Sequence, residues 1–210
     1  MTHTFLARAR VPALALAVAL TLAACGADDG ADHDLADTGG ASSSPDAPSD
    51  TATDAPYDAA DVMFAQMMLP HHEQAIEMSD ALLAKDGISP ELVDLAEQIK
   101  AAQGPEIDTL TAWLRDWGAD PEAGAGTGHD DHGMAGMMST EDMQALQDAT
   151  GADAERLFLE QMVAHHEGAV EMAQAEVSGG EHAGAVEMAQ SVVDTQTAEI
   201  QQMRDLLASR

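Results

Sequence analysis

The sequence FAQMMLPHHEQAIEM at residues 64–78 is repeated, with changes, as FLEQMVAHHEGAVEM at residues 158–172. A Phe, two Met, a His-His-Glu triplet, an Ala and a further Glu stand at the same places in both copies, at a constant offset of 94 residues (158 − 64). A second similarity follows each copy, because QGPEI at residues 103–107 corresponds to QTAEI at residues 196–200. Each half therefore resembles a helical hairpin, and the chain is predicted to be all-α, a four-helix bundle made of two duplicated hairpins.

Helix caps and glycine stops give the expected bounds. The bundle domain is assigned to residues 58–210, with repeat halves at 58–118 and 151–210. Long helices are predicted over 58–85, 90–117, 151–178 and 181–208. The connection, residues 119–150, is expected to contain a Met/His-rich central loop and then a short helix that a Ser139 capping box opens. Pro70 and Pro105 interrupt two of the long helices, where we expect kinks but no breaks.

The repeated stretch has one face rich in imidazole and thioether groups. At about 100° per residue, Met68, His71 and His72 fall within one sector about 120° wide, the usual width of a core-facing stripe. The neighbouring Glu73 and Glu77 fall on the opposite side. The histidines and methionines are therefore expected to face the bundle interior, and the acids to face water.

The N-terminus has the features of an export signal. An apolar run after two arginines ends in Leu-Ala-Ala-Cys, which resembles the lipobox of bacterial lipoproteins. Residues 1–24 are therefore assigned as a signal peptide, and Cys25 as the lipidation site. Residues 25–57 contain almost no large apolar side chains and are expected to form a disordered acidic tether. The sequence thus predicts an exported protein, anchored by lipid on the outer face of a bacterial membrane, at the cell surface or in the periplasm.

Charge and cysteine content limit the function classes. With 38 Asp and Glu against 8 Lys and Arg, the formal net charge of −30 argues against a nucleic-acid partner. A single cysteine excludes an intramolecular disulfide framework and a thiolate metal cluster.

The repeated donors favour a soft metal ion. Imidazole and thioether together, without thiolate or a converging carboxylate, suit Cu(I), with Ag(I) as its analogue and Cu(II) possible at His-rich positions. Thioethers also need no deprotonation, and they do not form disulfides outside the cytoplasm.

The two Met-x-x-His-His-x-x-Ala blocks, the downstream Gln-x-x-Glu-Ile elements and the Gly-Met-x-Gly-Met-Met segment resemble the domain of unknown function 305 family. This resemblance covers residues 58–209 and implies an exported, ferritin-like four-helix bundle that binds copper. Carried over by position, it implies metal-ligand candidates in both repeats and in the central loop. These are Met68, His71, His72, Met78, Met162, His165, His166 and Met172, with His129, His132, Met134, Met137 and Met138 in the loop. Leu110 departs from the pattern, because the second half has Met203 there.

Three functions remain open at this point. The first is a non-enzymatic, membrane-anchored copper-binding protein that sequesters Cu(I) or exchanges it with a donor or acceptor protein. The second is an interaction module that binds a partner through its Met-rich face without any metal. The third is a di-iron oxidoreductase, which needs inward Glu and Glu-x-x-His pairs. The chain contains no Glu followed by His three residues later, which disfavours the third function.

Overall fold

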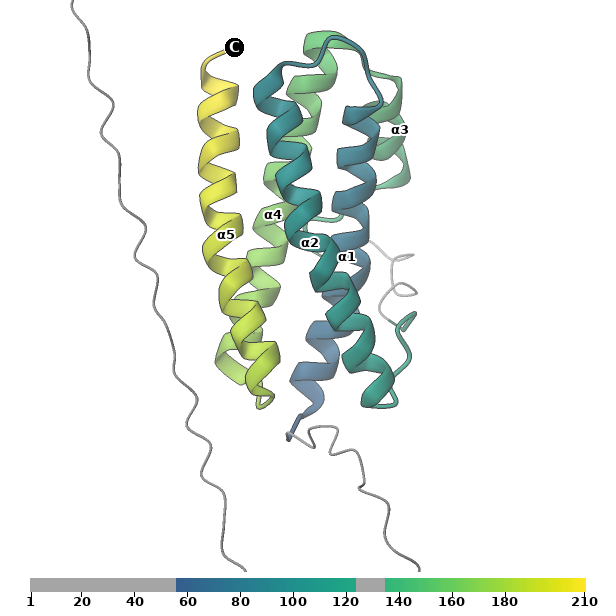
Figure 1. The fold of residues 1–210 in the computed structure, drawn as a ribbon, viewed down its shortest axis with the longest axis vertical. Helices are drawn as coiled ribbons and strands as arrows, with labels where there is room; N and C mark the ends of the chain where they lie inside the picture. Colours follow the sequence, from purple (N-terminus) through teal and green to yellow (C-terminus); the bar gives the residue numbers. More distant parts are fainter. Residues whose placement is uncertain (1–55, 124–134) are drawn as a thin grey trace, which may run out of the picture. The chain divides into compact units, whose positions relative to one another are not determined.

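The computed structural model describes residues 56–123 and 135–210. Within these residues the chain is all-α, with four long helices and one short one (Figure 1). The helices are α1 (Ala59–Leu83), α2 (Pro90–Asp116), α3 (Thr140–Asp148), α4 (Gly151–Gly179) and α5 (Ala183–Ala208). The predicted signal peptide 1–24, Cys25 and nearly all of the tether 25–57 lie outside the described residues. None of the described helices has a stretch apolar and long enough to span a bilayer.

Local sequence signals explain the helix starts. Asp58 caps α1 in a capping box with Asp61, and Ser139 caps α3 in the predicted capping box with Asp142. Pro90 occupies the first turn of α2, where its missing N–H is no loss. Both α1 and α2 continue through their internal prolines, as expected.

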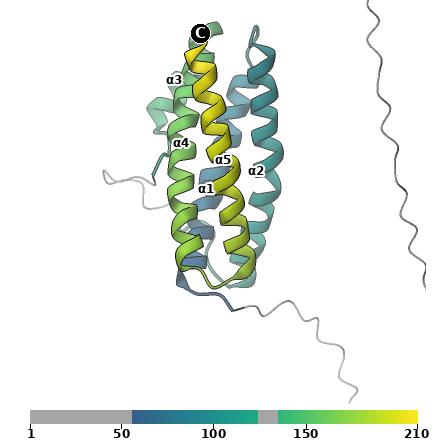
Figure 2. The same ribbon diagram turned by 90° about the vertical axis from the view of Figure 1, so that its left-hand side faces the viewer.

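The helices are arranged as two hairpins. α1 packs against α2 and α4 packs against α5, while α1 and α4 join the two hairpins face to face. Two views at right angles show the four long helices side by side, with α3 on the outer side of α1 and α4 (Figures 1 and 2). Because α1 and α4 carry the repeated stretch, the two copies of that stretch face each other across the centre of the bundle.

Two equivalent acids fasten each hairpin to the turn of the other. Asp61 in α1 accepts hydrogen bonds from the backbone N–H groups of His182 (2.9 Å) and Glu181 (3.3 Å), at the turn before α5. Glu155, which lies 94 positions later in α4, accepts one from the backbone N–H of Ser89 (2.5 Å), at the turn before α2. Burial opposes ionisation of Asp61, but the hydrogen bonds outweigh burial, so the pKa of Asp61 is lowered. These bonds fix the antiparallel register of α1 and α4.

Candidate metal centre

The repeated histidines lie inside the bundle. The side chains of His71, His72, His165 and His166 have no solvent exposure. The acidic neighbours predicted to face water do so, since Glu73 and Glu77 in α1 and Glu167 and Glu171 in α4 are all exposed. The helical phase read from the sequence is therefore confirmed for both copies.

His71 and His165 form an inner pair at the α1–α4 contact. Their ring centroids lie 3.7 Å apart, with an angle of 38° between the ring planes. His71 Nε2 lies 3.2 Å from the carbonyl oxygen of Ala135. A carbonyl oxygen can only accept, so this bond places the proton of the neutral imidazole on Nε2 and leaves a lone pair on Nδ1. Neither ring nitrogen of His165 has a hydrogen-bond partner.

Burial keeps the inner pair uncharged. Desolvation, and next the nearby His72, lower the pKa of His71 to about 3. Desolvation, followed by the neighbouring histidines, lowers the pKa of His165 well below its usual value. Both imidazoles are therefore neutral at neutral pH, which is the form that can coordinate a metal ion.

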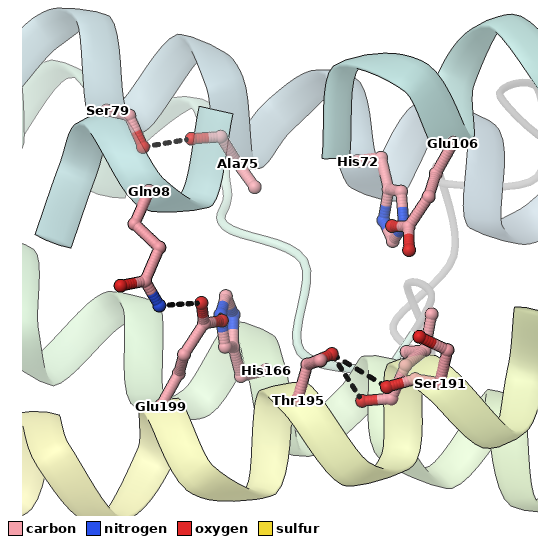
Figure 3. A network of polar contacts seen from close by, with 10 residues as sticks. His72, Ala75, Ser79, Gln98, Glu106, His166, Ser191, Thr195 and Glu199 are labelled. Atoms are coloured by element: carbon pink, nitrogen blue, oxygen red, sulfur yellow. Dashed lines mark hydrogen bonds and ion pairs between the residues drawn. The ribbon is translucent and has the colours of Figure 1, made fainter. Parts of the chain in front are cut away.

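His72 and His166, which we call the outer histidines, each meet a glutamate from the second helix of their own hairpin (Figure 3). His72 Nε2 lies 2.8 Å from Glu106 Oε2, and His166 Nε2 lies 2.9 Å from Glu199 Oε2. A carboxylate accepts, so both histidines donate through Nε2 and keep an unpartnered, buried Nδ1. A histidine that binds a metal through one nitrogen commonly donates its other N–H to a carboxylate.

These two glutamates correct the sequence analysis, which found no carboxylate converging on the histidines. The signal was present in the second repeated element, Gln-x-x-Glu-Ile, because Glu106 and Glu199 occupy its Glu position. The Gln of that element is also buried in both halves, and the side-chain oxygens of Gln103 and Gln196 have no partner. Sequence reasoning aligned these residues but assigned them no role.

The predicted thioether ligands pack on both sides of the inner pair. Because α1 and α4 are antiparallel, Met78 shares an apolar cluster with Met162, while Met68 shares another with Met172. Met68, Met78 and Met162 are fully buried, and Met172 is 8% exposed. Each cluster therefore combines thioethers from the two repeats.

A backbone segment, residues 135–138, crosses the outside of α1 and α4. Besides the Ala135 contact with His71, Gln74 exchanges two hydrogen bonds with the backbone of Met138, at 2.7 and 2.9 Å. Gly168 in α4 makes room for this segment, since a Cβ there would lie 1.9 Å from the Ala135 carbonyl oxygen. The loop candidates Met137 and Met138 are partly buried here. The other loop candidates, His129, His132 and Met134, lie outside the described residues.

Without methionine, the side chains in the described part of the chain do not assemble a complete metal site. Among residues 56–123 and 135–210, no three or more His, Cys, Asp or Glu side chains are placed to hold a single ion. Leu110 and its counterpart Met203 are both fully buried, in different apolar clusters.

The structure thus defines a class of protein, an all-α bundle of two duplicated hairpins with imidazole–carboxylate pairs in its core. The sequence matches the family described as domain of unknown function (DUF305) over residues 61–207, and the chain belongs to this family.

Solved structures of the family are similar to this chain. A DUF305 protein from Streptomyces coelicolor, named as secreted, is 32% identical with a TM-score of 0.65, over 71% of this chain and 91% of that one. A DUF305 fragment from Deinococcus radiodurans is 29% identical with a TM-score of 0.65, over 74% and 99%. CopM in its Cu(II)-bound form is 32% identical with a TM-score of 0.62, over 71% and 96%. CopM has also been solved in Cu(I)-bound and silver-bound forms. No curated protein matches the chain.

Proposed function

We propose that this protein binds Cu(I), and its analogue Ag(I), through the core histidines and the methionines packed beside them, and that it is a binding protein and not an enzyme. The observation that carries this proposal is the state of the Nδ1 atoms. All four histidines have a buried Nδ1 without a hydrogen-bond partner. A buried lone pair without a partner costs free energy in the metal-free protein, and a metal ion would relieve that cost.

The donor set suits a soft ion. Neutral imidazole and thioether are preferred ligands of Cu(I), and three of the four histidines have their Nε2–H bonded to an oxygen acceptor. Because His, Cys, Asp and Glu do not assemble a site within residues 56–123 and 135–210, the methionines are needed to complete one. The copper-bound and silver-bound forms of the similar CopM support the choice of ion.

We place this binding outside the cytoplasm, on a protein attached to the membrane by acyl chains at Cys25. The lipobox-like sequence supports the anchor, and the similar Streptomyces coelicolor protein is named as secreted. The net charge of −30 would raise the local concentration of cations at the protein surface. The protein would thus sequester copper or exchange it with a donor or acceptor protein.

The proposal is tested by titrating the metal-free protein with Cu(I), and separately with Ag(I), against a competing chelator. The double variant His71→Leu/His165→Leu should bind at least about 100-fold more weakly, which corresponds to about 2.7 kcal/mol. Glu199→Gln, which keeps the shape but removes the negative charge beside His166, should weaken binding by about tenfold or more. The matched control Glu73→Gln/Glu167→Gln changes exposed acids beside the same histidines and should bind like the wild type.

Folding of the double variant is checked by its thermal unfolding without metal. Leucine removes three buried nitrogens that lack partners and only one hydrogen bond, from His71 Nε2 to the Ala135 carbonyl, so the unfolding temperature should change little. A correctly folded double variant that binds Cu(I) as tightly as the wild type would refute the assignment of these histidines.

A further inference from the structure

A small crevice opens between α1 and α4, at the end of the bundle where α1 begins. It has a volume of about 80 Å³ and is lined by Met63, Met67, Met172 and Glu176, together with Ala60, Phe64 and Ala175. Met63 and Met67 lie one helical turn apart on α1, and Met63 is 57% exposed. Neither methionine is among the ligands predicted from the sequence.

The internal repeat supplies a comparison for this crevice. At the offset of 94 residues, Met63 corresponds to Leu157, Met67 to Gln161 and Glu176 to Leu82. Only Met172 corresponds to another methionine, Met78. At these three positions, the end of the bundle where α1 begins thus carries two thioethers and a carboxyl group. The other end carries no thioether and no carboxyl group at the equivalent positions.

At the other end of the bundle, α3 covers the positions equivalent to this crevice. Gln161 donates a hydrogen bond to the backbone oxygen of Asp142 in α3, at 3.0 Å. Met143 and Leu146 of α3 belong to the same apolar cluster as Met78. Helix α3 packs against both α1 and α4 there (Figure 1). The crevice with the extra donors is therefore the one that α3 leaves open.

Glu176 adds a buried carboxyl group to this crevice. Its side chain is 2% exposed, and neither of its carboxyl oxygens has a hydrogen-bond partner. The nearby Asp61 is engaged by the backbone N–H groups of Glu181 and His182. A monovalent cation held by the three thioethers would favour the ionised carboxylate of Glu176, which would then neutralise the charge of the ion.

Met172 connects this crevice to the core. It lines the crevice and also belongs to the apolar cluster that contains Met68, three residues before His71. Three thioethers beside one carboxyl group select a soft monovalent ion over harder divalent cations.

We propose that Met63, Met67 and Met172 form a surface capture site for a soft monovalent ion, Cu(I) or Ag(I), with Glu176 as its counter-charge, and that the ion passes from this site to the buried histidines. The second half of this inference rests on the proposed function. The first half, the capture site itself, does not.

The test is a titration of the purified protein, labelled with ¹³C at the methionine methyl groups, with Ag(I). Signals of Met63 and Met67, assigned by single Met→Leu variants, should shift. The variant Met63→Leu/Met67→Gln introduces the residues of the other repeat. After Ag(I) is added to this variant, the signals of core methionines such as Met68 should shift about tenfold more slowly than in the wild type. The control Met188→Leu removes a thioether of α5 that does not line the crevice, and it should load at the wild-type rate.

The outcomes separate the two proposals. In His71→Leu/His165→Leu, the shifts of Met63 and Met67 should persist. Shifts of the core methionines without any response of Met63 and Met67 would overturn the capture site and leave the proposed function standing. Shifts of Met63 and Met67 with no effect on the core, in the wild type, would refute the proposed function and retain the capture site. No shift at any methionine would overturn both.

Discussion

In the first repeat His71 bonds to the carbonyl oxygen of Ala135, whereas in the second repeat the equivalent His165 has no hydrogen-bond partner. The next histidines behave alike, since His72 and His166 each meet a glutamate within 3 Å. The duplication has therefore kept the histidine–glutamate pairs and altered the surroundings of the inner pair. We infer that the outer histidines contribute more to the stability of the bundle, and that the inner pair contributes more to metal binding.

The largest expected effect is the loss of stability when an outer histidine is replaced, and this loss should be greater for His166 than for His72. His166→Leu leaves Glu199 nearly buried, with only Gln98 as a donor at 3.0 Å, and should lower the free energy of unfolding by about 3 kcal/mol. His72→Leu leaves Glu106, whose side chain is 21% exposed and can bind water, so the loss should be about 1 kcal/mol. Urea denaturation with a metal chelator present measures both. Equal losses would show that exposure of the glutamate does not control the effect.

The segment that crosses α1 and α4 provides the next test. Gly168→Ala places a methyl group against the backbone of Ala135 and should cost about 2 kcal/mol, since backbone has to move. Gln74, its counterpart in the first repeat, holds the same segment through hydrogen bonds to Met138. Gln74→Ala should therefore cost less, about 1 kcal/mol. Hydrogen exchange at the Met138 amide should speed up in both variants, and unchanged exchange would contradict this contact.

A pH dependence should distinguish the two ends of the bundle. Burial, and then Asp61, raise the pKa of Glu176 from 4.5 to about 8. Between these values the native protein keeps a proton that the unfolded chain has lost, so this group makes stability fall as the pH rises.

Glu176→Leu, which introduces the residue of the first repeat, should remove that fall. It should raise the free energy of unfolding at pH 8 by about 2 kcal/mol and have much less effect near pH 4.5. Denaturation curves at both pH values test this, and a variant that is equally stabilised at both would argue against a protonated native Glu176.

The smallest effect concerns the internal proline of α1. Pro70 corresponds to Ala164, and proline inside a helix cannot donate the usual backbone hydrogen bond. Pro70→Ala should stabilise the protein by about 1 kcal/mol or less, because α1 already accommodates the proline. Thermal unfolding of this variant and of Pro105→Ala provides the comparison. A clear loss of stability would show that the proline contributes to packing.

Much of the fold could be predicted because the same pattern occurs twice. The repeated stretch determined which residues of α1 and α4 face the core, and caps such as Ser139 marked helix starts that the structure reproduces. The role of Glu106 and Glu199 could not be predicted, since it depends on how α2 and α5 rotate against the histidines. The Met63 crevice depends on which end α3 covers, and no local pattern in the sequence encodes that choice.

The exchanged contacts of Asp61 and Glu155 have a consequence for the ancestry of the molecule. Each acid satisfies backbone groups that belong to the opposite hairpin, so neither hairpin is complete alone. A single hairpin could form the same bonds by pairing with an identical copy in the opposite direction. The present chain is thus the structure expected when the gene of a twofold-symmetric homodimer is fused to itself, after which its two copies are free to diverge.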